Sequence, residues 1–537
     1  MTPEVSAPSS APTRTLPPQD HVDQQPRPHP GVTTVLVGIL LALGVAAIAV
    51  LYRLSPYPSD QLNYFDAARE FPHRSSTGGG EHQLLRIGLI VPLRLAQMLF
   101  GYSQGAYLLV PTLAAIGLAV AVYALGVLLF NRTVGFAAAV LTVGNSIVFT
   151  DLTAPLPDLL ATALLCGAVA LTLAIRQGRH VVTASARRQA GALVMVGILL
   201  GWSYLTREYI VFCWPLVPFL LWKRLPYRRL LWIVAPLTAI GLVELGLNAA
   251  ASGDALARLH ASASHGQSPR STSFIGHSRQ WYLSRPAAIL GGTPEGTWLK
   301  AALLATVAAP LISRRLAFLA GWAAIFALPL IALGGFLDPD HPMLRITKER
   351  YWIPLMPAVY LCAVAGVWLL ARNRATVVPA LRGRSRVVAT WVTLAVVAVP
   401  VGIAQHARMT EPTPQNASFA ANGGVQLEHL RPWLDQHSTG VTTVWAEPRT
   451  YRLVKLFATG TFGGPVWSGE LKLWLPGASH PQPLPGDYVV LYSPRSGVCG
   501  PCRDNAEALL GSPVHVPASW QPAFISSRRV VEIYQVR

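Results

Sequence analysis

The first stretch of this chain that could do chemistry is residues 59–70, SDQLNYFDAARE. Asp60 follows directly on the apolar run 31–52, which is long enough to cross a bilayer. Its carboxylate is therefore expected where the chain leaves the hydrocarbon, beside the ring of Tyr64. A carboxylate held there can take the proton of a hydroxyl nucleophile, an effect of roughly a hundred- to ten-thousandfold in rate. The alternative is an ordinary first-turn acid that complements the helix dipole.

A helix that starts at Pro58 and Ser59, with the serine as its cap, is predicted for this stretch. Asp60 and Tyr64 then share one face, one turn apart. Leu62 and Phe65 lie on another side, where they could rest on the membrane surface. Asp66 lies on a third face and is expected to be a solvated charge.

A second acid, Asp158, opens the apolar run 158–175 after two prolines. An acid at a helix start is common, which is the plain alternative here as well. Asp158 nevertheless falls on the same predicted side of the membrane as Asp60. Two converging acids could hold a divalent cation or divide the base and orienting roles, and the sequence leaves both open.

A third group is basic. Arg345, Lys348 and Arg350 come just before an apolar run, on the side that short basic loops usually avoid. Such cations can bind a phosphate and stabilise the charge that develops on it. Arg207 and Glu208, at the end of another run, join Tyr64 as candidates for binding substrate, although Glu208 could simply pair with Arg207. Weaker candidates lie in the predicted loops: His265, His277, Arg279 and His341.

Cys499 and Cys502 lie between a strand-like run and a helix-like run. That arrangement suits a redox site, but too little chain follows for a thioredoxin-type fold, so a structural disulfide is preferred. The other three cysteines lie in apolar runs and are expected to be small apolar residues of the interior.

The composition and the recurring apolar runs indicate which elements position these residues. The chain is 52% hydrophobic and 13% charged, about half the charged fraction of a typical soluble protein, and apolar runs recur along it. We predict a mainly α, polytopic membrane helix bundle of about eleven spans. The run 84–101 contains Arg86 and Arg94 and is expected to be interfacial or re-entrant instead. The predicted spans are 31–52, 102–130, 133–150, 158–175, 191–205, 209–222, 230–250, 298–312, 316–336, 351–370 and 387–404.

The net charge of +18 resides in short arginine-rich loops between these runs. All of these loops fall on one side if 84–101 does not cross, which places the amino terminus in the cytoplasm. This explains the charge without a nucleic-acid partner. Three parts are predicted: a disordered cytoplasmic tail (1–31), a transmembrane catalytic module (32–404) and a small extracytoplasmic α/β domain (405–537). The cell membrane is the expected location.

Over residues 33–404 the chain resembles the GT-C superfamily of membrane glycosyltransferases, and within it glycosyltransferase family 39, the protein mannosyltransferase and aminoarabinose transferase group. Besides SDQLNYFDAARE, the matching motifs are LPDLLATALL at 156–165, GILLGWSYLTRE at 197–208 and ERYWIPLMP at 349–357.

This resemblance implies a polyprenyl-phosphate-linked sugar as donor, a lipid, glycan or protein as acceptor, and transfer outside the cytoplasm with inversion at the anomeric carbon. It makes Asp60 and Asp158 the candidate catalytic acids. Many relatives carry a second acid beside the first, whereas Gln61 stands here, which puts metal binding at that position in doubt. The rival hypotheses are a transporter or lipid flippase, which usually shows midplane charges and internal repeats, and a non-catalytic membrane scaffold.

Overall fold

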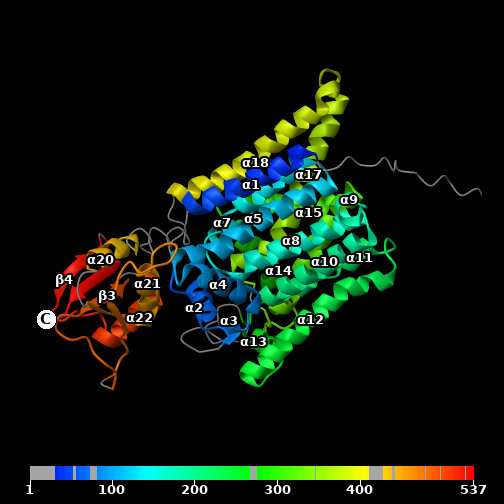
Figure 1. Cartoon of the computed structure of the whole chain (residues 1–537). Helices are drawn as coiled ribbons and strands as arrows, with labels where there is room; N and C mark the ends of the chain where they lie inside the picture. The colour runs from blue at the N-terminus through cyan, green and yellow to red at the C-terminus, as the bar shows by residue number, and fades with distance from the viewer. Residues whose placement is uncertain are drawn as a thin grey trace, which may run out of the picture.

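The chain folds as a bundle of helices with a small mixed sheet at one end, as Figure 1 shows, and this confirms the predicted fold class. The computed structural model describes residues 31–51, 56–72, 81–265, 275–344, 346–410, 427–437, 442–477, 479–495, 497–526 and 528–537. The predicted tail 1–31 lies almost entirely outside these residues, as does Arg345.

Eight of the described helical segments are long and apolar enough to cross a membrane. They are α1 (Val32–Leu51), α5 (Gln104–Leu129), α8 (Pro157–Arg176), α10 (Ala186–Thr206), α12 (Tyr227–Ser252), α16 (Arg314–Ile331) with η4 (Ala332–Phe336), η5 (Glu349–Leu355) with α17 (Met356–Val377), and η6 (Pro379–Arg384) with α18 (Ser385–Thr410).

Shorter apolar helices occupy the other three predicted spans and the predicted interfacial run. They are α4 (Ile87–Phe100), α6 (Arg132–Gly144), η1 (Glu208–Cys213) with α11 (Leu216–Leu221), and α15 (Gly296–Ala308) with η3 (Ala309–Leu311). The span predicted over 133–150 is interrupted because Asn145 is extended and begins a new helix, α7 (Ser146–Asp151). The Asn145 side chain accepts the Ile147 N–H at 2.9 Å, which caps α7.

Four further helices lie between these elements: α2 (Asp60–Glu70), α3 (Glu81–Leu84), α13 (Ala257–His265) and α14 (Arg279–Gly291); a short α9 (His180–Thr183) precedes α10. The region 251–296 lies between two predicted spans, and its described residues include the helices α13 and α14. Helix α2 starts at Asp60 as predicted, but the Ser59 side chain makes no capping hydrogen bond.

Two expectations for α2 are wrong. Leu62 and Phe65 are fully buried in a hydrophobic cluster with α4, α5 and the sheet domain, instead of resting on a membrane surface. Asp66 is not a solvated charge, because it accepts a hydrogen bond from Tyr102 at 2.6 Å and pairs with Arg452 at 3.2 Å. Both differences arise because α2 packs against α4, α5 and the domain that follows the last apolar helix.

This domain is built on a five-stranded sheet of order β2-β1-β3-β5-β4. Strand β1 pairs in parallel with β2 and β3, while β5 pairs antiparallel with β3 and β4. Its elements are α20 (Leu430–Gln436), β1 (Thr443–Ala446), α21 (Pro448–Phe457), β2 (Glu470–Leu473), β3 (Tyr488–Tyr492), η8 (Gly497–Cys499), α22 (Gly500–Leu510), β4 (Gln521–Ile525) and β5 (Val531–Gln535). In Figure 1 it lies beside α2, α3 and α4. Cys499 and Cys502 form a disulfide and are both buried.

Candidate functional site

Asp60 lies at the start of α2 with its carboxylate held by two donors. Arg350, from η5, donates to Oδ2 at 2.6 Å, and Gln83, from α3, donates to Oδ1 at 2.7 Å. About a third of the Asp60 side chain is exposed (34%), and so is part of Arg350 (23%). The carboxylate is therefore oriented and accessible at once.

Asp158 lies at the start of α8 and is fully buried. Its Oδ1 is 3.0 Å from Nε of Arg207 and accepts a hydrogen bond from Tyr209, and its Oδ2 is 3.8 Å from Nε of Arg350. Arg350 thus lies between the two acids, which come from segments almost one hundred positions apart. The structure brings Asp60, Asp158, Arg207 and Arg350 into one cluster, whereas Lys348 is exposed at the N-terminal end of η5.

Arg207 is fixed between two aromatic rings. Its guanidinium carbon is 4.6 Å from the ring centre of Tyr209 and 4.5 Å from that of Tyr351. Cation–π contacts of this kind are stronger when water is excluded, as it is from this buried arginine. Its ion pair with Asp158 is shorter than its 4.0 Å approach to Glu208, so the simple pairing of neighbours is not its main contact.

Glu208 instead forms ion pairs with two arginines from other parts of the chain. Arg86, just before α4, and Arg258, in α13, each approach one of its oxygens at 3.5 Å. Arg258 also pairs with Glu244 of α12 at 2.6 Å. The close approach of α4 to α10 permits this, because a Cβ on Gly88 would lie 2.4 Å from Oγ1 of Thr206.

The sequence reading missed Arg86, Arg258 and Glu244 as members of the cluster. Two of them carried a signal, since Arg86 and Glu244 are charged residues inside apolar runs, and such residues usually face the protein interior. Nothing in the sequence around Arg258 marks it.

Tyr64 is buried and its hydroxyl accepts a hydrogen bond from Arg86. Burial raises the pKa of Tyr64 to about 12, against the opposing effect of Arg86, so the phenol stays neutral. In this position Tyr64 can orient Arg86, and its ring is closed off from solvent.

Asp151, at the end of α7, is a further acid beside the cluster that was not singled out from the sequence. It is 3% exposed, and among the described residues its Oδ2 has no hydrogen-bond partner. Burial, and next the charge of Asp158, raise the pKa of Asp151 to about 8, although Arg350 opposes the shift. Asp151 is therefore mostly a neutral acid at pH 7.

The residues present do not fit a divalent cation held jointly by the two predicted acids. A guanidinium, that of Arg350, lies between Asp60 and Asp158, where a metal bridging both carboxylates would have to be. Within the described ranges, no group of three or more His, Cys, Asp or Glu side chains is arranged to hold a metal ion.

The weaker candidates lie apart from these contacts. His277 stacks on Trp281 with ring centres 4.1 Å apart, and His341 is exposed beside Asp338. The side chain of His265 is outside the described residues. The cluster thus offers one accessible carboxylate and one partly accessible guanidinium, supported by buried ion pairs.

Comparison with known proteins agrees with the resemblance inferred from the sequence. Residues 92–247 match the family model described as dolichyl-phosphate-mannose-protein mannosyltransferase. The match covers less than half of the chain and includes Asp158, Arg207 and Glu208. It confirms the resemblance over this segment. No curated protein sequence matches the chain.

Solved structures with a similar chain fold include ArnT and an archaeal oligosaccharyltransferase. ArnT from Cupriavidus metallidurans in the apo state has a TM-score of 0.49 and 13% identity, covering 93% of this chain and 97% of that chain. The same protein bound to undecaprenyl phosphate has a TM-score of 0.46 and 16% identity, covering 79% and 84%. The archaeal oligosaccharyltransferase AglB from Archaeoglobus fulgidus has a TM-score of 0.42 and 13% identity, covering 81% and 64%.

Proposed function

We propose that this protein is a membrane glycosyltransferase that moves a sugar from a polyprenyl-phosphate donor to an acceptor hydroxyl, with Asp60 as the general base. The observation that carries the proposal is the accessible Asp60 carboxylate held by Arg350 beside a buried network of arginines. The family match over residues 92–247 supports the donor class, since the family's description names a dolichyl-phosphate-linked sugar.

The chemistry follows from the two accessible groups. Asp60 accepts the proton of the acceptor hydroxyl while the hydroxyl oxygen forms a bond to the anomeric carbon of the sugar. The bond from that carbon to the phosphate oxygen breaks at the same time, and its electron pair leaves with the lipid phosphate. A single displacement of this kind inverts the anomeric centre.

Arg350 is suited to stabilise the departing phosphate. A guanidinium can donate two hydrogen bonds to a phosphate, and the strength of such pairs rises where water is excluded. Because Arg350 also contacts Asp60, proton acceptance at the carboxylate would weaken that ion pair as the phosphate gains charge. The arginine could then turn its donors to the phosphate.

The membrane setting supports a lipid-borne donor. Asp60 is separated from the end of α1 by eight residues, so it lies near the end of an apolar helix of 20 residues. The arginine-rich loops follow the other ends of the predicted spans, so by the positive-inside rule we expect the reaction side to be extracytoplasmic.

The test is a transfer assay on membranes that carry the protein, with a panel of polyprenyl-phosphate sugars and measurement of which lipid is consumed. Asp60→Asn is expected to lower transfer about a hundred- to ten-thousandfold. Its free energy of unfolding should change by less than about 1 kcal/mol, because the lost ion pair is partly exposed.

Asp504→Asn is the matched control, since that acid lies on the surface of α22 with 67% of its side chain exposed. It should leave transfer unchanged. Full activity of Asp60→Asn, or consumption of no polyprenyl-phosphate sugar by the wild type, would overturn the proposal.

A further inference from the structure

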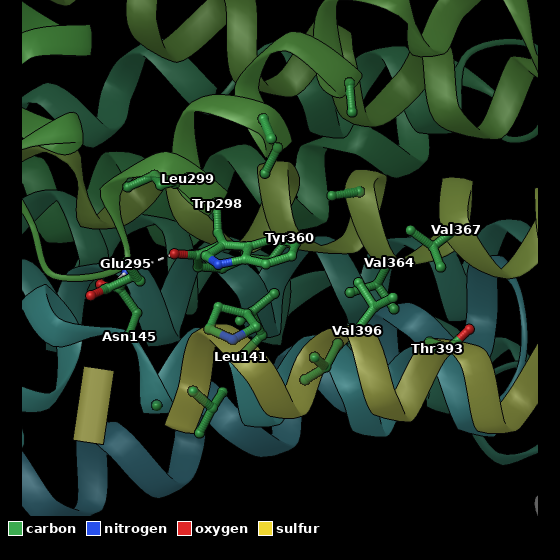
Figure 2. Close-up of a pocket in the computed structure, with 18 residues that line it drawn as sticks. Leu141, Asn145, Glu295, Trp298, Leu299, Tyr360, Val364, Val367, Thr393 and Val396 are labelled. Atoms are coloured by element: carbon green, nitrogen blue, oxygen red, sulfur yellow. Dashed lines mark hydrogen bonds between the residues drawn. The ribbon is translucent and has the colours of Figure 1, made fainter. Parts of the chain in front are cut away.

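A cavity of about 230 Å³ lies among α6, α15, α17 and α18, and no residue of the Asp60 cluster lines it. Its walls are mostly apolar: Figure 2 shows the rings of Trp298 and Tyr360 together with aliphatic side chains such as Val364 and Val367. Along α17 it extends from Tyr360 to Val367, which is about 10 Å at 1.5 Å per residue. These dimensions suit one extended alkyl chain.

One end of the cavity is polar. Figure 2 shows Glu295 and Asn145 together at this end, while Val367 and Thr393 lie at the other. Oε1 of Glu295 accepts hydrogen bonds from Asn145 Nδ2 at 2.6 Å and from the Ser146 N–H at 2.7 Å, which ties it to the start of α7. These contacts give that oxygen a structural role.

The second carboxylate oxygen has no such role. Glu295 is only 3% exposed, and its Oε2 lacks a hydrogen-bond partner among the described residues. Within the same part of the chain, no arginine, lysine or histidine forms an ion pair with Glu295. A buried carboxylate normally requires a compensating donor or cation, so Oε2 points to a ligand group of that kind.

The cavity also has an entrance. Ala301 and Ala305, on α15, line the cavity and are themselves exposed, so the cavity opens to the surface beside α15. This helix is one of the shorter apolar helices of the bundle. A lipid chain could enter sideways between α15 and its neighbours. A water-soluble ligand would gain little from these apolar walls.

We propose that this cavity binds one alkyl chain of a membrane amphiphile whose head group carries a primary ammonium that pairs with Glu295. The carboxylate is the one acidic group of the lining, so it selects for a cation, and the apolar walls select for the chain. The site is separate from the proposed transfer reaction, and helix α7 joins its polar end to Asp151.

The test uses the full chain in lipid nanodiscs and a dodecylamine that carries a photoreactive diazirine in its chain. After irradiation, mass spectrometry locates the labelled peptides. Labels are expected on the segments of α15, α17 and α18 that line the cavity. Ala305→Trp should close the entrance and abolish this labelling.

Leu304→Trp is the matched control, because Leu304 is the preceding residue of α15, is 71% exposed and does not line the cavity. It should label as the wild type does. Equal labelling of Ala305→Trp and the wild type would overturn the proposal, since the probe would then be reporting bulk lipid contact.

Competition tests the head group. Unlabelled dodecylamine is expected to displace the probe about tenfold better than dodecanoate, the size of effect that one charge-assisted hydrogen bond provides. Glu295→Gln should remove this preference while labelling persists. Equal displacement by the amine and the carboxylate in the wild type would overturn the assignment of Glu295. Labelling is measured without any sugar transfer, so a negative result here is independent of a negative result in the transfer assay.

Discussion

The two acids predicted from the sequence are alike in type and differ in surroundings. Asp60 keeps about a third of its side chain exposed, whereas Asp158 is fully enclosed by Arg207, Tyr209 and Arg350. A group that exchanges a proton with a substrate must be within reach of it. We therefore propose that Asp60 is the base and that Asp158 positions the two arginines.

This division predicts different outcomes for the two asparagine variants. Asp158→Asn is expected to lower both transfer and stability, because it leaves Arg207 buried without its main ion pair, a loss of about 3–5 kcal/mol. Thermal unfolding in detergent, measured beside the transfer assay, separates it from Asp60→Asn. Wild-type stability of Asp158→Asn would contradict the positioning role.

At the scale of single residues, Asp151 makes the stability of the fold depend on pH. Its pKa is raised from the ordinary 3.8 to about 8, so between these values the folded protein holds a proton that the unfolded chain has lost. The stability contributed by the neutral acid is full below about pH 4 and is lost as the pH rises to about 8, at up to about 1.4 kcal/mol per pH unit. The groups that act on it are Asp158, Arg350 and Glu349.

Asp151→Asn should remove this component, because the amide resembles the protonated acid and has no proton to lose. Melting temperatures measured from about pH 5 to about pH 9 are expected to fall less steeply for the variant than for the wild type. Parallel curves for the two proteins would show that Asp151 is not a buried neutral acid.

At the scale of elements, a chain of hydrogen bonds joins the sheet domain to Asp60. Arg452 of α21 donates to Asn63 of α2, Asn63 donates to Gln83 of α3 at 3.1 Å, and Gln83 donates to Asp60 at 2.7 Å. The same arginine pairs with Asp66 at 3.2 Å. The domain therefore helps to orient the start of α2, where the candidate base lies.

We expect Arg452→Gln to slow transfer roughly ten- to a hundredfold at saturating donor, because small displacements of a catalytic group have effects of that size. Gln83→Leu should act through the same chain of contacts. The double variant should then lose less than the sum of the two single effects, expressed as free energies.

Arg503→Gln, at a partly exposed arginine of α22, is the control for a charge change in the same domain. Additive effects of Arg452→Gln and Gln83→Leu would mean that the two residues act independently. If Arg452→Lys retained wild-type transfer, the positive charge at this position would matter more than the several N–H donors of the guanidinium.

At the scale of the whole molecule, the sheet domain and the helix bundle share one hydrophobic cluster. It joins Leu62 and Phe65 of α2 to residues of α4, α5, α21, β3 and β5, and it includes Cys499 and Cys502. The shared cluster explains why α2 is buried although its sequence suggested a surface helix. It also places the disulfide in the packing of the domain.

The disulfide is therefore expected to be structural. Cys499 and Cys502 are three positions apart, so the closed loop is short and its contribution to stability should be below about 3 kcal/mol. A Cys499→Ser, Cys502→Ser double variant should retain transfer and lose some thermal stability of the domain. Loss of transfer with unchanged stability would indicate redox chemistry at this pair.

The amino-acid sequence by itself determined the class of fold, the start of α2 at Asp60, the start of α8 beside Asp158, and most of the apolar helices. These features are local. They depend on runs of apolar residues and on acids at helix starts, and each can be recognised within a short stretch of the sequence. The same local signals mark Asp60, Asp158 and Arg350 as candidate site residues.

Only the tertiary structure decided which charges meet. Arg350 reaches Asp60 across 290 positions, and Arg86 reaches Glu208 across 122. Burial follows from such contacts, so the sequence could not tell that Asp158 is enclosed, that Asp151 is neutral, or that Leu62 and Phe65 pack inside. A side chain's charge state and exposure depend on neighbours that only folding brings to it.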